Sequence, residues 1–153
     1  MNVHGTGIVL AGTGVMLRGP SGSGKSLLAL VLIDAFAARG LAAELVGDDR
    51  LDLAISHGLV TMAPPPAIAG LVELRGRGIL SRPYLPSAAI GLVVDLVESL
   101  ERMPEKAAFS TELLGVTVPR CPVPQAGVAG VEHQVLLVRE ALTALGQSDA
   151  KTA

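Results

Sequence analysis

The sequence predicts an α/β fold in which a mixed β-sheet is covered by one buried helix and one amphipathic C-terminal helix. The first observation is the order strand, Gly-rich loop and apolar helix over residues 14–33. The second is that later strand-like segments do not alternate regularly with helices, which favours a mixed sheet over a fully parallel one. The third is a set of apolar residues at helical spacing near the C-terminus: Val131, Val135, Val138, Leu142 and Leu145.

Length and composition are typical of one domain. A chain of 153 residues can bury one core, and we expect a single domain over residues 1–146 followed by a frayed tail, 147–153. Apolar residues make up 50% of the chain and aromatic residues only 2%, which excludes an aromatic platform for stacking RNA bases. Cys121 is the only cysteine, so an intrachain disulfide is excluded and a reducing compartment fits.

Charge and hydropathy exclude two classes of partner. The formal net charge of -2 gives no general attraction to nucleic acid or anionic membranes. Mean hydropathy is high at +0.53, but the longest apolar runs end at Asp34 and Asp95 and are far shorter than the roughly 20 residues of a spanning helix. The first residues lack the pattern of a signal peptide. We therefore expect a cytoplasmic protein with no nucleic-acid or membrane partner.

The chain is expected to begin with a β-hairpin and a helix. Residues 7–11 and 15–17 are strand-like and flank a Gly-rich turn. A helical pattern runs from Ser26 to Arg39, and Gly40 is placed to end it in the left-handed conformation. Because the helix is almost wholly apolar, we expect it to lie buried against the sheet.

The rest of the chain is mostly strand-like. Strand candidates are residues 41–46, 51–55, 59–62 and 89–97. Residues 70–80 begin extended and become a Gly-punctuated loop that carries arginines, and the prolines 64–66 are expected in an exposed connection. Residues 98–112 are expected to form a flexible surface segment. Three prolines within 116–124 predict an edge strand or a rigid extended arm.

One loop has the P-loop pattern G-x-x-x-x-G-K-[ST]. Its residues are Gly19, Pro20, Ser21, Gly22, Ser23, Gly24, Lys25 and Ser26. Glycines let the backbone N–H groups point at phosphate oxygens, Lys25 adds positive charge, and the Ser26 hydroxyl can bind Mg²⁺. The start of the next helix adds partial positive charge there. An ordinary Gly-rich turn is the alternative, but the flanking strand and helix favour a phosphate site.

Acidic and basic residues downstream could complete a phosphoryl-transfer site. Asp48 and Asp49 follow an apolar strand and could supply a metal-linked carboxylate and a general base, whereas a turn with an Asp cap would explain only one of them. Glu73 lies in an apolar segment, where it either pairs with Arg75 or binds a metal. The arginines at 75, 77 and 82 form a solvated surface or, aided by the intervening glycines, a phosphate contact.

Four of these elements occur together in one known family. His4-Gly5, the loop 19–26, Asp48-Asp49-Arg50 and the segment Glu73-Leu74-Arg75-Gly76-Arg77-Gly78-Ile79 follow one another in this order. The chain thereby resembles the catalytic domain of the HPr serine kinase/phosphorylase family, from His4 to the last helix, and looks like a short form without the N-terminal domain of longer members. The resemblance implies an HPr kinase/PEP carboxykinase-like fold and a kinase that uses ATP and Mg²⁺ to phosphorylate a seryl residue of HPr.

The resemblance also implies roles for single residues. Asp48 matches the family's proton acceptor, and Lys25 and His4 match its active-site Lys and His. Ser26 and Glu73 match its magnesium ligands. Asp49, next to Asp48 after the apolar strand, is a further candidate ligand.

Two further arginines enter the catalytic set through the resemblance. Arg75 belongs to the signature over residues 74–80, which serves both reaction directions in the family. Arg102 is the best match to a later catalytic arginine. Longer relatives assemble into hexamers, so self-association is a further expectation.

The sequence departs from the family at two places. Leu27 replaces the usual acidic residue after the loop. The family's Arg-rich Pro-Val-x-Pro-Gly-Arg loop, tied to phosphorolysis, is Pro122-Val123-Pro124-Gln125-Ala126-Gly127-Val128 here, without arginines. The second departure argues against phosphorolysis.

Two other functions compete with a protein-serine kinase. One is a nucleotide-binding regulatory module that signals to a sensor-kinase or phosphotransferase partner without efficient phosphoryl transfer. The other is a generic small NTPase or metabolite kinase, which explains Glu73–Ile79 poorly. A module that only binds nucleotide needs the loop but no base, so the set Asp48, Glu73 and Arg75 favours the kinase.

Overall fold

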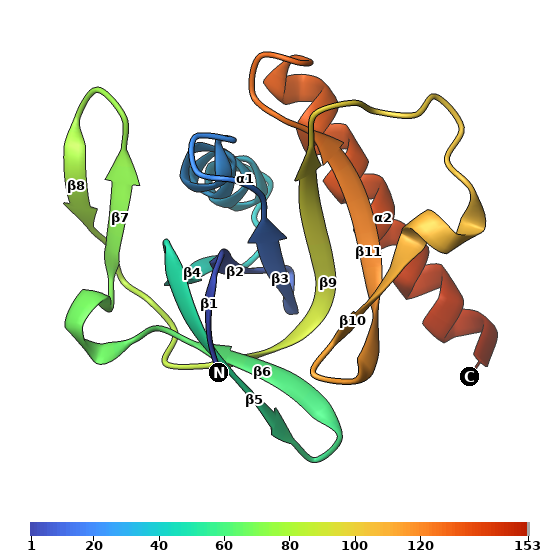
Figure 1. The fold of residues 1–153 in the computed structure, drawn as a ribbon, viewed down its shortest axis with the longest axis horizontal. Helices are drawn as coiled ribbons and strands as arrows, with labels where there is room; N and C mark the ends of the chain where they lie inside the picture. Colours follow the sequence, from blue (N-terminus) through green and yellow to red (C-terminus); the bar gives the residue numbers. More distant parts are fainter. Residues whose placement is uncertain (153) are drawn as a thin grey trace.

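The computed structural model describes the backbone of residues 1–152 and the side chains of residues 1–146, and it has the mixed α/β architecture that the sequence predicts (Figure 1). In the described part, nine strands form one sheet. They are β1 (Asn2–His4), β2 (Thr6–Leu10), β3 (Thr13–Arg18), β4 (Ala43–Gly47), β5 (Arg50–Ser56), β6 (Leu59–Ala63), β9 (Ala88–Val97), β10 (Ser110–Leu113) and β11 (Val116–Pro124).

The sheet is mixed, and the long strand β9 is its centre. The order is β1-β5-β6-β9-β3-β2-β4, and β11 joins through β9 while β10 pairs with β11. β9 runs parallel to β3 and β11 but antiparallel to β6. The remaining strands, β7 (Leu71–Leu74) and β8 (Gly78–Ser81), form a separate antiparallel hairpin. Consecutive β2 and β3 form the hairpin that the sequence predicts.

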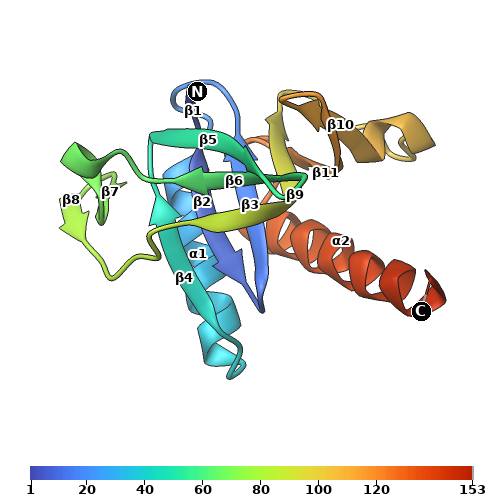
Figure 2. The same cartoon turned by 90° about the horizontal axis from the view of Figure 1, so that it is seen from below.

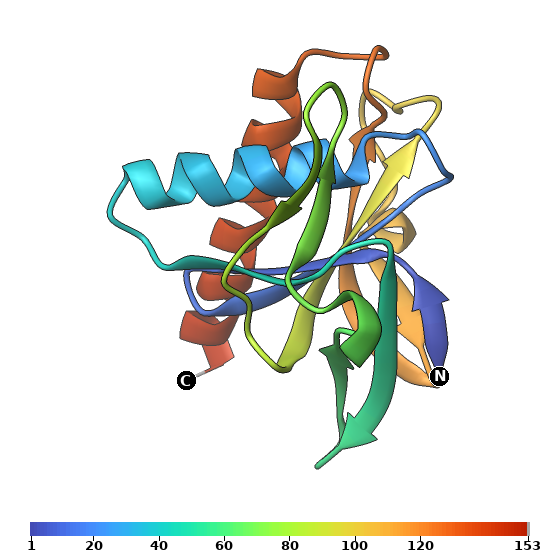
Figure 3. The ribbon, with the colours of Figure 1, turned by 90° about the vertical axis from the view of Figure 1, so that its left-hand side faces the viewer.

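Two helices cover one face of the sheet. α1 (Lys25–Ala38) packs on β2, β3 and β4 and lies beside the β7–β8 hairpin, and α2 (Val131–Thr152) packs on β11 (Figure 3). Seen from below, the β7–β8 hairpin and α2 lie on opposite sides of the molecule (Figure 2). Neither helix is long and apolar enough, over the described residues, to cross a membrane.

Each face of the sheet has its own apolar core. The core under the helices joins side chains of β2, β3 and β9 to Leu28, Leu32 and Phe36 of α1 and Val138 of α2. On the opposite face, β5, β6 and β10 of the same sheet contribute to a second core, whose buried side chains include Met16, Met62 and Val93. The sheet is therefore covered on both faces and positions the C-terminal ends of β3 and β9 rigidly.

Helix α1 confirms the prediction of a buried helix after the Gly-rich loop. Its buried residues Leu28, Ala29, Leu32 and Phe36 recur at helical spacing. The helix ends where Gly40 adopts a left-handed φ of 75° and the Leu41 N–H donates to the Phe36 carbonyl at 3.0 Å.

Other segments differ from the sequence prediction. Residues 98–112 are not all a flexible surface segment, because a 3-10 helix (Lys106–Phe109) leads into β10, which pairs with β11. Residues 70–80 form the β7–β8 hairpin, and β1 pairs with β5, neither of which the sequence revealed. Strand β11 pairs with β10 over its first half and with β9 over its second half, so each half has one partner, as expected for a proline-bearing edge. Helix α2 runs across residue 147, where we placed the domain boundary, and that boundary stays a prediction.

Candidate active site

The loop Gly19–Ser26 joins the end of β3 to the start of α1 and lines a cleft of about 370 Å³. The Ser23 N–H donates to the Pro20 carbonyl, and Gly24 has a φ of 97°. A Cβ on Gly24 would lie 3.0 Å from Cβ of Ala126, so both conformation and space require glycine there. The N–H groups of Lys25, Ser26 and Leu27 make no hydrogen bond within the described residues, as expected at a helix start.

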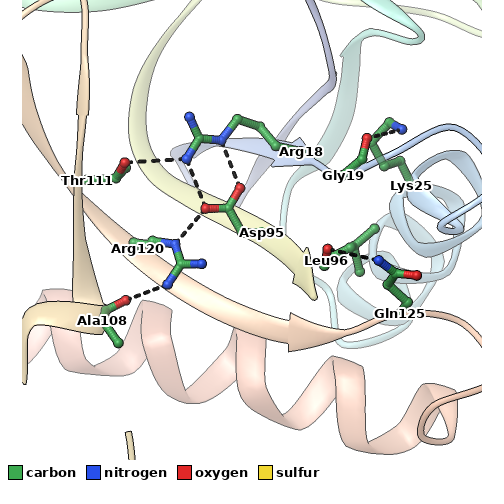
Figure 4. Close-up of polar contacts among 9 residues, drawn as sticks. All are labelled: Arg18, Gly19, Lys25, Asp95, Leu96, Ala108, Thr111, Arg120 and Gln125. Atoms are coloured by element: carbon green, nitrogen blue, oxygen red, sulfur yellow. Dashed lines mark hydrogen bonds and ion pairs between the residues drawn. The ribbon is translucent and has the colours of Figure 1, made fainter. Parts of the chain in front are cut away.

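Two polar side chains of the loop, Lys25 and Ser23, differ in their hydrogen bonding. Lys25 Nζ donates to the Gly19 carbonyl at 2.8 Å (Figure 4). It also donates to the Pro20 carbonyl at 3.1 Å. The Ser23 hydroxyl is buried without a hydrogen-bond partner among the described residues. The Lys25 ammonium group and the unpaired N–H groups at one helix N-terminus fit an anionic phosphate group.

Asp48 connects three elements beneath the cleft. It follows β4 and is 5% exposed. Its carboxylate accepts hydrogen bonds from Thr6 Oγ1 at 2.8 Å, from Ser26 Oγ at 2.7 and 2.8 Å, and from the backbone N–H of Glu73 at 3.1 Å. Because these three partners all line the cleft, Asp48 ties β2, α1 and β7 together at its floor.

Asp49 lies apart from its neighbour because the backbone turns between them. Its φ of 68° is left-handed, and the Arg50 N–H donates to the Asp48 carbonyl at 2.8 Å. Asp49 therefore faces the cleft with a side chain that is 76% exposed, and its Oδ1 lies 4.0 Å from Nδ1 of His4. The adjacent acids occupy different environments, one buried and hydrogen-bonded and one open to solvent.

The β7–β8 hairpin brings Glu73 and Arg75 to the cleft, where both side chains are part of its lining. Val72 of β7 is fully buried in the core shared with α1 and anchors the hairpin there. No ion pair joins Glu73 to Arg75 among residues 1–146, so the structure does not support that alternative. Arg77 and Arg82 do not line the cleft.

Arg102 is not brought to this cleft. It lines a separate, mostly apolar groove between the segment 100–109, β11 and α2, together with His133 and Leu137. The sequence missed Thr6 and Ala126, which do line the cleft. Neither has a local sequence signal, because each reaches the site only through the pairing of distant segments.

The donor atoms at the cleft fit a hard divalent cation shared with a nucleotide. Ser26, Asp49 and Glu73 offer oxygen atoms, and no group of three or more His, Cys, Asp or Glu side chains in the described residues could hold a metal alone. Mg²⁺ commonly binds through one or two carboxylates together with water and substrate phosphates, so this set suits an ion that arrives with phosphate.

Behind the loop, Asp95 of β9 bridges two arginines (Figure 4). Arg18, which precedes Gly19, donates to its carboxylate from Nε at 2.8 Å and Nη2 at 2.9 Å, and Arg120 of β11 donates from Nε. Burial raises the pKa of Asp95, but the hydrogen bonds and charges of both arginines outweigh it and hold this pKa below its ordinary value. Arg120 also donates to the Ala108 carbonyl at 2.9 Å. The network fixes the start of the loop to β9, β11 and the 3-10 helix.

The fold and the cleft define a mixed α/β domain in which a Gly-rich loop, carboxylates and basic side chains meet. Residues 1–142 match the family model of the HPr Serine kinase C-terminal domain. The chain is 35% identical to the HPr kinase/phosphorylase of Enterococcus faecalis over 135 residues, which cover 80% of this chain and 42% of that protein. The match to the protein of the same name from Bordetella petrii is 40% over 79 residues, 51% of this chain and 24% of that one.

A solved structure with a similar fold supports the same family. The Hpr(Ser) kinase/phosphatase of Coxiella burnetii superposes with a TM-score of 0.79 at 25% identity, covering 99% of this chain and 96% of that one. This chain belongs to the HPr serine kinase C-terminal domain family. It spans less than half the length of the curated relatives it matches, 42% for the Enterococcus faecalis protein.

Proposed function

We propose that this chain is an ATP- and Mg²⁺-dependent protein-serine kinase that phosphorylates a seryl residue of an HPr-type phosphocarrier protein. The observation that carries the proposal is the Asp48 carboxylate, which lies directly beneath the cleft and is hydrogen-bonded to Ser26, a residue of the Gly-rich loop that lines it. Transfer of a phosphoryl group to a hydroxyl needs a phosphate cradle, a cation and a carboxylate that takes the hydroxyl proton. Membership of the HPr kinase family supports this reaction class.

In this proposal the loop Gly19–Ser26 binds the nucleotide phosphates. Its free N–H groups and the Lys25 ammonium group supply the positive field. Ser26, Asp49 and Glu73 supply oxygen ligands to Mg²⁺, which neutralises phosphate charge when bound.

Asp48 accepts the proton of the substrate Ser hydroxyl while the Ser oxygen forms a bond to the γ-phosphorus of ATP. The bond between that phosphorus and the β–γ bridging oxygen breaks, and ADP leaves. Arg75 at the cleft stabilises the charge of the transferring phosphoryl group. His4, whose Nδ1 lies 4.0 Å from Asp49 Oδ1, orients the Asp49 carboxylate in this proposal. Arg102 stays a prediction from resemblance without support from the cleft geometry.

The test is transfer of labelled phosphate from ATP to a panel of purified HPr-type proteins, with mass spectrometry to locate the modified residue. Asp48→Asn is expected to lower transfer about 10³-fold, since a general base contributes about 10²–10⁴, while ATP still binds. Asp34→Asn, on the exposed side of α1, is the matched control and should behave as wild type.

Two outcomes would contradict the proposal. Unchanged phosphate transfer by Asp48→Asn would show that Asp48 is not the general base. A wild-type chain that binds ATP but labels no carrier would favour the regulatory module that signals to a sensor-kinase or phosphotransferase partner.

Phosphorolysis of phospho-Ser carrier by inorganic phosphate is expected to be negligible, because residues 122–128 contain no arginine. Sedimentation would test the expected self-association into a hexamer.

A further inference from the structure

A buried hydroxyl group outside the predicted set contacts the central carboxylate. Thr6 lies on β2, is 0% exposed, and donates from Oγ1 to Asp48 Oδ1 at 2.8 Å. Among the described residues this is the one hydrogen bond its hydroxyl makes. A buried hydroxyl requires such a partner, and the β-branched side chain of threonine in a strand is restricted in rotation, so its direction is fixed by the sheet.

The donors around Asp48 are divided between its two oxygens. Thr6 donates to Oδ1, the Glu73 N–H donates to Oδ2, and the Ser26 hydroxyl lies within 2.8 Å of both. Two donors thus belong to the scaffold, one on each oxygen, and they fix the plane of the carboxylate. All three residues line the cleft, and Ser26 is the donor that belongs to the Gly-rich loop.

The direction of the Ser26 hydroxyl follows from that of the carboxylate. When the Ser26 hydroxyl donates its hydrogen bond to Asp48, the lone pairs of Oγ remain free to bind another partner. The position of the Asp48 carboxylate determines the direction in which these lone pairs point. Groups that orient a metal ligand in this way commonly change metal affinity by about 10–100-fold. The hydrogen bonds therefore run in series from Thr6 to Asp48 to Ser26.

We propose that Thr6 is a positioning residue: its buried hydroxyl orients the Asp48 carboxylate and, through it, the Ser26 hydroxyl that binds the Mg²⁺ of the nucleotide. This inference rests on the proposed function, from which it takes the role of Ser26. It adds β2 to the elements that determine how the chain couples metal to nucleotide.

The experiment compares the ATP affinity of the full chain with Mg²⁺ and with a chelator, by calorimetry. Wild type should bind ATP more tightly with Mg²⁺. Thr6→Val, which keeps the shape and removes the hydroxyl, should lose about tenfold of this Mg²⁺-dependent gain and bind metal-free ATP as wild type does. Thr6→Ser should restore the gain, and kcat for the carrier protein should fall about tenfold in Thr6→Val with little change in KM.

Thr61→Val is the matched control, because Thr61 is also a strand threonine but makes an exposed hydrogen bond, to the Ala54 carbonyl across the β5–β6 hairpin. Its Mg²⁺-dependent gain should equal that of wild type. Thr6→Ala removes the same hydroxyl and replaces Thr6→Val if that variant does not fold.

The outcomes separate this inference from the proposed function. A Thr6→Val chain with the full Mg²⁺-dependent gain overturns the inference, as does a Thr6→Ser chain that loses as much as Thr6→Val. If wild type binds Mg-ATP but labels no carrier, the kinase proposal fails and the calorimetry still decides the role of Thr6. If wild type binds no ATP, both fail.

Discussion

Replacing Asp95 with asparagine would leave the guanidinium groups of Arg18 and Arg120 facing a neutral amide. Hydrogen bonds to charged groups contribute about 1.5–3 kcal/mol each, and an amide keeps one acceptor oxygen of the two. The side chains of Arg18 and Arg120 are 30% and 22% exposed, so water replaces part of the loss. We therefore expect the free energy of unfolding to fall by about 2 kcal/mol, which lowers Tm by about 4–8 °C for a chain of this length.

The dependence on pH supplies a second signature. The folded-state pKa of Asp95 is lower than its unfolded value, so the stabilisation is complete above about pH 4 and is lost as the pH falls through the folded-state pKa. Asparagine does not titrate, so the difference between wild type and Asp95→Asn should shrink in acid.

The assay is urea unfolding followed by circular dichroism, at neutral pH and at several pH values below about 4. Asp34→Asn, on the exposed side of α1, is the control and should change stability by less than about 0.5 kcal/mol. A loss below about 0.5 kcal/mol at neutral pH, or a difference that persists unchanged in acid, would refute the reasoning.

Three further predictions concern the loop, the sheet and the cysteine. Lys25→Ala should weaken ATP binding at least about tenfold, since hydrogen bonds to charged groups contribute about 1.5–3 kcal/mol; unchanged affinity in a binding titration would contradict the phosphate cradle. Gly14→Ala should lower the free energy of unfolding by about 3 kcal/mol, because the new Cβ would lie 1.9 Å from the Ala89 carbonyl oxygen. Gly146→Ala in α2 places its Cβ where no atom lies within 4 Å and should raise the free energy of unfolding by about 0.5–1 kcal/mol. Equal Tm values for the two variants would refute this contrast. Burial raises the pKa of Cys121 to about 11, so at neutral pH its alkylation, followed by mass spectrometry, should be slow when folded and fast in denaturant.

Local patterns in the sequence were enough to predict the first half of the site. The β2–β3 hairpin, the Gly-rich loop and α1 are consecutive, and each depends on neighbours a few residues away, such as Gly40 at the helix end. The adjacency of Asp48 and Asp49 was visible, but their separation into a buried and an exposed carboxylate was not. That separation arises from the left-handed φ of Asp49, which the neighbouring residues in the sequence do not predict.

The missed features depend on tertiary pairing. Ser110–Leu113 has a polar composition and becomes a strand because β11 lies beside it, with Leu113 buried in the core. Thr6 looks like any strand residue until β4 places Asp48 next to it. Arg102 was chosen from its sequence neighbourhood, but its location follows from the fold, in which residues 100–109 line a groove together with β11 and α2.

The parallel pairing of β3 with β9 has a consequence for how the chain acquires its site during synthesis. Arg18 and Asp95 are 77 positions apart, so β3 can pair with β2 early but lacks its other neighbour, β9, until well over half the chain has emerged. Pairings of such high sequence separation close late and slowly, because loop entropy must be overcome first. The loop that follows β3 is made early, yet it gains its fixed foundation among the last events of folding. Nascent or truncated chains that end before β9 should therefore not bind ATP in the cleft, and nucleotide binding reports completion of the sheet.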